Sequence, residues 1–180
     1  MESPQGGFTL IELILVIGMI AFVAAITAPR LLGQNAWESF FVTEIQAALR
    51  YAGNLAVSSG CRVRVTIYDE NDAPIAASGP GRSYDLSTEG GALCNDGVFS
   101  TPVFNPANNN QPYEGEISGT LTFTSTQNPI YVDPLGRFGS LAGVAPNVTV
   151  VPAPDATPIV LTVGTRTLSI SGQSGYVEAN

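Results

Sequence analysis

Histidine and lysine are both missing from this sequence of 180 residues, and most of its charged residues are acidic. Without histidine, Ser-His-Asp catalysis, Cys-His catalysis and histidine-ligated metal sites are all excluded. The chain has seven arginines and fifteen carboxylates. Its net charge of −8 disfavours the basic surface that nucleic-acid binding requires. Two cysteines are too few for a structural zinc site, although they suffice for one disulfide. We therefore expect no cofactor and no catalytic residue.

The length of the chain limits it to one modest domain with an appendage. Apolar residues make up 44% of it, enough for a core, and its 19 glycines and 13 prolines indicate many turns. Charged residues make up only 12%, which is low for a freely soluble cytosolic domain.

A long apolar run, FTLIELILVIGMIAFVAAITA, occupies residues 8–28. A helix of this length covers roughly 31 Å, about the thickness of one hydrocarbon core. A core helix that is apolar on every face needs a far larger protein around it. A secretory signal peptide cut near Ala25 is the other alternative, but the preceding MESPQGG lacks the basic residues of such signals. The run therefore favours a single transmembrane helix.

Glu12 is the one charged residue in this run. A carboxylate in a spanning helix costs something like 2.5–3.5 kcal/mol near the bilayer centre and less near an end. No lysine or arginine lies within helical reach on the same segment, so a cationic partner on another subunit is favoured. A new α-amino group, made by cutting the chain just upstream, meets that need.

The hexapeptide Gly7-Phe8-Thr9-Leu10-Ile11-Glu12 resembles the class III signal of type IV prepilins and type II secretion pseudopilins. The resemblance implies that prepilin peptidase cuts after Gly7 and that Phe8 becomes the N-methylated N-terminus. It also implies that Glu12 pairs with the Phe8 amine of a neighbouring subunit and that Pro29 kinks the helix. The expected divisions are a leader (1–7), a transmembrane and filament-core helix (8–29) and a periplasmic globular domain (30–180). One departure from the family is the leader, which carries Glu2 where basic residues are usual.

Downstream, the pattern predicts a second helical half and then a β-rich region, an α+β fold in which a long N-terminal helix packs on antiparallel strands. Helical spacing of apolar residues runs from Ala36 to Ser58, with Gly60 as the C-terminal cap. The face expected to be buried comprises Trp37, Phe40, Phe41, Ile45, Ala48, Leu49, Ala52, Leu55 and Ala56. Strands are expected at 62–68, 83–86, 120–124, 130–132, 147–151, 159–163 and 167–170. Residues 105–112 are expected to form an exposed loop.

Two segments near the end are similar to motifs of GspH/FimT-type minor pilins: residues 133–137 (DPLGR) and residues 170–177 (ISGQSGYV). The sequence from residue 49 to residue 63, which contains Cys61, more closely resembles the MSHA-type members of that group. Either segment is equally a glycine-turned β-hairpin. Because the resemblance places the globular domain in an oxidising compartment, we expect a Cys61–Cys94 disulfide, with two free buried thiols as the alternative.

Three clusters of charged residues suggest other functions: a calcium site, a hydrolase and nucleic-acid binding. Asp69, Glu70 and Asp72 form an acidic turn that lacks the ligand spacing and glycine of a calcium loop. Glu114 and Glu116 alternate along an extended segment, but nothing marks the cleft that a paired-carboxylate hydrolase needs. Arg62 and Arg64 share one face of a strand, yet nucleic-acid grooves need several cations together.

The sequence therefore predicts a minor pilin or pseudopilin, a substrate of an enzyme rather than an enzyme. Its expected partners are prepilin peptidase, other pilins, the assembly platform and the bacterial inner membrane, where it is single-pass with its globular domain in the periplasm. Nucleic acid is disfavoured as a partner. Two alternatives stay open, a membrane-anchored periplasmic binding domain and a DNA-uptake pilin.

Overall fold

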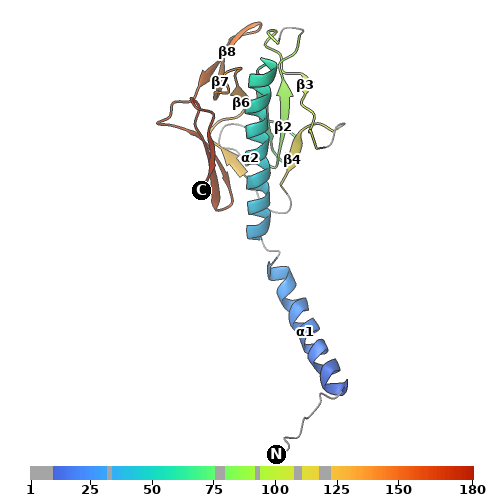
Figure 1. The fold of residues 1–180 in the computed structure, drawn as a ribbon. Helices are drawn as coiled ribbons and strands as arrows, with labels where there is room; N and C mark the ends of the chain where they lie inside the picture. Colours follow the sequence, from blue (N-terminus) through green and yellow to red (C-terminus); the bar gives the residue numbers. More distant parts are fainter. Residues whose placement is uncertain (1–9, 32–33, 76–79, 92–93, 108–110, 118–122) are drawn as a thin grey trace, which may run out of the picture. The chain divides into compact units, whose positions relative to one another are not determined.

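The computed structural model describes residues 10–31, 34–75, 80–91, 94–107, 111–117 and 123–180, and for residues 24–31 and 34–35 it describes the backbone alone. The chain divides into two compact units, Met1–Ala36 and Trp37–Asn180, which we describe separately (Figure 1). The predicted cleavage site, Gly7 and Phe8, lies outside the described residues.

The first unit consists of helix α1, Leu10–Leu31, with Glu12 in its first turn. Its described side chains, from Leu10 to Val23, are all exposed, and Leu10 and Ile11 keep 76% and 73% of their surface. The helix continues through Pro29 for two further residues, so a kink at that proline stays a prediction. No helix in the described part of the chain has both the length and the hydropathy that a membrane span requires.

Helix α2, Gln34–Ser59, packs one face against the sheets of the second unit. Gly60 follows it with a φ of 70°, and its amide donates to the carbonyl of Ala56, which confirms the predicted cap. Six of the residues expected on the buried face are buried: Phe41, Ile45, Ala48, Leu49, Ala52 and Ala56.

The prediction for α2 is wrong at its first turns. Trp37 and Phe40 keep 50% and 64% of their surface, although both were expected on the buried face. Glu38, expected off that face, is 5% exposed, and its carboxylate accepts hydrogen bonds from the amide and hydroxyl of Thr165. These donors give the buried carboxylate the partners that it needs.

Two antiparallel sheets make up the rest of the second unit. The larger has the strand order β3-β2-β1-β6-β7-β8, with β4 also pairing with β2; the smaller has the order β11-β10-β9-β5. The larger contains β1 (Val63–Tyr68), β2 (Ser83–Thr88), β3 (Thr101–Pro102), β4 (Glu114–Glu116), β6 (Ile130–Val132), β7 (Phe138–Val144) and β8 (Asn147–Pro152). The smaller contains β5 (Phe123–Ser125), β9 (Ile159–Val163), β10 (Arg166–Ile170) and β11 (Val177–Ala179).

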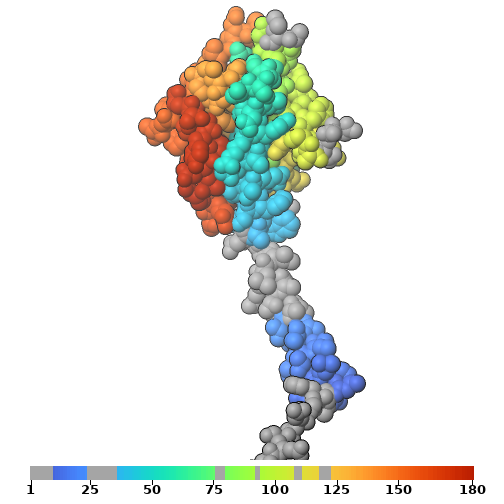
Figure 2. Space-filling model, viewed as in Figure 1, coloured from blue at the N-terminus to red at the C-terminus, as the bar shows by residue number. Residues whose placement is uncertain are grey.

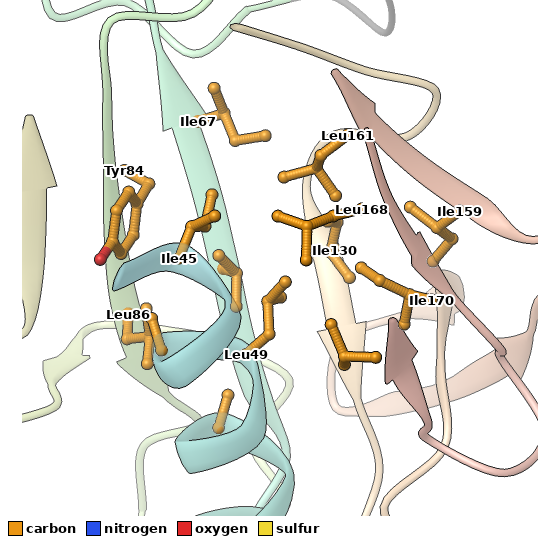
Figure 3. Close-up of a cluster of buried hydrophobic side chains, with 14 of the residues drawn as sticks. Ile45, Leu49, Ile67, Tyr84, Leu86, Ile130, Ile159, Leu161, Leu168 and Ile170 are labelled. Carbon is orange, nitrogen blue, oxygen red and sulfur yellow. The ribbon is translucent and has the colours of Figure 1, made fainter. Parts of the chain in front are cut away.

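Helix α2 lies at the surface of this unit, with the green to yellow strands β2, β3 and β4 on one side and the orange to red later strands on the other (Figure 1 and Figure 2). Its core residues Ile45 and Leu49 lie between side chains of β2 and side chains of the smaller sheet (Figure 3). Phe41 packs on Tyr84 and Phe123, with ring centroids 6.0 and 5.0 Å apart. Burial of this helix face therefore joins the two sheets into one core.

The α+β class, with helices packed on antiparallel sheets, is confirmed. Strands occur at each of the predicted positions, although in 120–124 only the last two residues are described, as the start of β5. Strands β3 and β7 were not predicted from the sequence. The segment of β4 was predicted only as extended, and that of β11 only as part of a β-hairpin.

Candidate assembly and anchoring sites

Glu12 is presented on an exposed apolar helix. It lies in the first turn of α1, with Leu10, Ile11, Leu13 and Ile14 exposed around it. A carboxylate near a helix N-terminus interacts favourably with the helix dipole. The surrounding apolar surface is far larger than monomeric soluble proteins expose. This segment therefore needs a lipid or protein environment to cover it.

The predicted disulfide between Cys61 and Cys94 is present, with the Cα atoms 5.1 Å apart. It joins the segment between α2 and β1 to the loop that follows β2. Beside it, the Arg62 guanidinium donates to both carboxylate oxygens of Glu89 at 2.7 and 2.8 Å. The amide of Gly97 donates to the same carboxylate at 2.7 Å. One covalent bond and one buried ion pair thus fix the loop between β2 and β3 to the start of β1.

The two arginines considered for nucleic-acid binding both make internal contacts. Arg62 is held by Glu89, whose side chain is fully buried. Arg64 donates to the hydroxyl of Ser87 and the carbonyl of Phe99, and its guanidinium lies 5.6 Å from the centre of the Phe99 ring. Both arginines therefore make contacts that stabilise the fold.

The acidic turn after β1 is organised by its own backbone. The carboxylate of Asp69 accepts hydrogen bonds from the amides of Asn71 and Ala73. The amides of Ala73 and Asn71 hold the pKa of Asp69 below its ordinary value. Among the residues that the structure describes, no three Cys, Asp or Glu side chains are placed so that they could hold a metal ion together.

The two segments near the end of the chain come together beside α2. In the first, Asp133 accepts from the amides of Leu135 and Arg137 and pairs with the Arg137 guanidinium. In the second, the Ser171 hydroxyl donates to Asp155, and Gly175 lies against the carbonyl of Gly136. They border a groove of about 370 Å³ whose lining includes Arg50, Val57, Leu135 and Ser174. Both segments are turns, as the hairpin interpretation predicted.

A partly buried acid, Glu44, lies where α2 packs on β2. The Tyr84 hydroxyl donates to Oε1 of Glu44 at 3.3 Å. Burial raises the pKa of Glu44, and the hydrogen bond from Tyr84 partly offsets that rise. Burial, together with the nearby charge of Glu44, raises the pKa of Tyr84 far above its ordinary value. The sequence offered no signal for this pair, because its members are 40 residues apart.

Comparison with known proteins bears on the N-terminal segment. Residues 3–28 match the prokaryotic N-terminal methylation motif. The chain carries a methylation motif. The match includes all the residues predicted for processing and assembly: Gly7, Phe8 and Glu12. No curated protein shows significant sequence similarity to this chain.

Among solved structures, the chain with this methylation motif is similar to the type IV minor pilin FimU of Pseudomonas aeruginosa in two crystal forms. Identity is 15% in both, with TM-scores of 0.41 and 0.46. The aligned regions cover 77% and 83% of this chain and 89% and 92% of the FimU chains.

Proposed function

We propose that this protein is a minor pilin or pseudopilin of the GspH/FimT type, a structural subunit rather than an enzyme. The observation that carries the proposal is the methylation motif over residues 3–28. The exposed apolar surface of α1 supports it, because such a helix needs a membrane or other helices around it. The subunit resides in the inner membrane, with its globular unit in the periplasm, until it enters a type IV pilus or a type II secretion pseudopilus.

Processing begins with prepilin peptidase, which cuts between Gly7 and Phe8 and leaves a new α-amino group for N-methylation. The apolar helices then leave the bilayer and bundle in the filament core. There Glu12 pairs with the Phe8 amine of a neighbouring subunit and sets the stagger between the two. The second unit, locked by the Cys61–Cys94 disulfide, remains folded on the outside of the bundle.

Processing is tested by co-expressing the chain with prepilin peptidase. Gly7→Val should block the cut, because the bulky side chain occupies the position before the scissile bond. Gly6→Val is the matched control, one residue further from the bond, and should still be cut. If both variants, or neither of them, are processed like the wild type, cleavage after Gly7 is wrong.

Assembly is tested separately with Glu12→Ala. Removing one member of a desolvated charge pair typically costs about 3–5 kcal/mol, enough to exclude the variant from a complex. The variant should be processed normally but should no longer co-purify with other pilins from detergent extracts. Glu70→Ala, which removes an exposed acid from the turn after β1, is the control and should assemble. Normal partner capture by Glu12→Ala would contradict the pairing role.

A rival is a membrane-anchored periplasmic binding domain. The groove beside α2, with Arg50 and exposed Val57 and Leu135 along it, is the feature that favours this function. An anchored receptor keeps Met1 or is cut near Ala25, so the N-terminus separates the two functions.

A further inference from the structure

The first turns of α2 present two large aromatic side chains on the outside of the second unit. Trp37 and Phe40 keep 50% and 64% of their surface. Residues three apart on a helix are neighbours on one face, so the two rings form one exposed aromatic patch. Single exposed apolar residues are ordinary on a folded surface, whereas contiguous apolar surface marks a contact with a partner or with a membrane.

The charged residues in this part of α2 are kept away from the aromatic patch. Glu38 is buried, and its carboxylate accepts hydrogen bonds from Thr165. Glu44 is partly buried and accepts a hydrogen bond from Tyr84. Every residue from 36 to 49 is described, and the exposed ones are all uncharged: Ala36, Trp37, Phe40, Thr43 and Ala47. The outward face of α2 therefore carries no charge before Arg50.

The place of the aromatic patch in the chain indicates what covers it. Trp37 follows Ala28, the last residue of the apolar run, by nine positions. Residues 29–31 and 34–37 are helical and rise about 1.5 Å each, and the link between them spans at most about 3.6 Å per residue. Trp37 therefore lies within about 20 Å of the end of the apolar run, for any orientation of α2. The headgroup layer of a membrane that holds the run is within reach of the patch.

We propose that the aromatic patch docks α2 onto the headgroup layer of the membrane that holds residues 8–28. This inference rests on the proposed function, which places the apolar run in the inner membrane, and it adds a lipid contact made by the second unit. Before assembly, lipid surrounds the end of the run, whereas another protein must first bind. Tryptophan is enriched in this layer because its ring is apolar while its indole N–H stays hydrated. The contact uses apolar surface rather than charge, since a net charge of −8 repels anionic lipids.

Trp37 is the only tryptophan in the chain, so its fluorescence reports on the aromatic patch directly. The full chain is reconstituted into phosphatidylcholine vesicles at a low ratio of protein to lipid. The emission should lie at shorter wavelength than that of free tryptophan amide in water. Lipids brominated close to the headgroup should quench it more than lipids brominated near the end of the acyl chain. Both effects should persist in high salt and after phosphatidylglycerol is added, because the contact does not depend on charge.

A matched variant moves the tryptophan to another exposed site of the second unit. Trp37→Phe combined with Phe104→Trp uses a ring position that is 54% exposed. This position lies close to the strand residue Tyr113, which stacks on Tyr51, about four turns along α2 from Trp37. Acrylamide should quench the tryptophan at position 104 several-fold more than the one at position 37, and brominated lipid should barely quench it.

Trp37→Phe combined with Phe40→Trp keeps the tryptophan within the aromatic patch and should behave like the wild type. Retention of each protein by the vesicles is measured by sedimentation in the same samples. If the chain is retained but acrylamide quenches Trp37 as strongly as the tryptophan at position 104, the docking is wrong and the proposed function stands.

Two further outcomes overturn the proposal. If Trp37 is shielded from acrylamide but escapes brominated lipid, or is shielded only at a high ratio of protein to lipid, a protein covers the aromatic patch in place of the headgroup layer. A chain that the vesicles do not retain overturns both this inference and the membrane residence in the proposed function.

Discussion

The carboxylate of Glu89 and the guanidinium of Arg62 form a buried ion pair, with Nη1 2.7 Å from Oε1, beside the disulfide at Cys61. The Glu89 side chain is fully buried, whereas Arg62 keeps 21% of its side-chain surface. The carboxylate also satisfies the amide of Gly97. One carboxylate thus binds both the residue before β1 and the loop between β2 and β3.

Glu89→Ala should lower the free energy of unfolding by about 2–3 kcal/mol, because it leaves a part-buried arginine and a backbone amide without their acceptor. Urea unfolding of the full chain in mild detergent measures the loss. Glu70→Ala, in the exposed turn after β1, is the control and should change stability by less than about 0.5 kcal/mol. Equal effects of the two variants would contradict a structural role for the ion pair.

Replacing both cysteines, Cys61→Ser with Cys94→Ser, should cost about 3–4 kcal/mol of stability, because the unfolded chain regains the entropy of the open loop. Reductant should cause a similar loss in the wild type and none in the double variant. The number of titratable thiols in the untreated wild type should be zero. Two reactive thiols in protein exported to the periplasm would contradict the bridge.

Glu44→Gln should stabilise the fold at neutral pH and have little effect at about pH 4. Burial raises the pKa of Glu44 above its ordinary value of 4.5, so the folded state binds its proton more tightly than the unfolded state. The ionised acid therefore destabilises the fold as the pH rises through the folded-state pKa, and glutamine removes that penalty while still accepting from Tyr84. Thermal unfolding at both pH values measures the difference. A variant that is less stable than the wild type at neutral pH would contradict this account.

Gly164→Ala should destabilise the fold more than Gly60→Ala does. Both glycines have a positive φ, 57° and 70°, where a Cβ costs about 1–2 kcal/mol. A Cβ on Gly164 also meets the buried Glu38 carboxylate, whereas one on Gly60 meets open space. Thermal unfolding of the two variants isolates the contact with Glu38. Equal losses of stability would show that the Glu38 side chain moves away from the added Cβ without a further loss of stability.

How much of the structure could be predicted from the sequence depends on how many residues each sequence pattern spans. Local patterns predicted α2, its cap at Gly60 and most strands, because periodicity and turn residues act over a few positions. The exposure of Trp37 and Phe40 was missed, because helical spacing alone does not say where the covering sheet ends. The burial of Glu38 depends on Thr165, a partner 127 residues away that no local pattern reveals. The pairing of Glu44 with Tyr84 was missed for the same reason.

Strand β7 was also missed. Its sequence FGSLAGV contains two glycines, which weaken any strand prediction. Gly139 leaves room for the carbonyl of Val151 in β8, and Gly143 does the same for the carbonyl of Asn147. These glycines therefore allow the close approach of the two strands. In the N-terminal segment, by contrast, a short motif carried the functional prediction, because its residue types and spacing are specific.

The most direct test of the central claim is the mass of the N-terminal peptide of the protein extracted from membranes that contain prepilin peptidase. The proposed function predicts a peptide that begins at Phe8 and carries one additional methyl group on its α-amino nitrogen. Residues 1–7, including Glu2, should be missing. A peptide that retains Met1, or one that begins near Ile26 after a signal-peptidase cut, would contradict the pilin assignment.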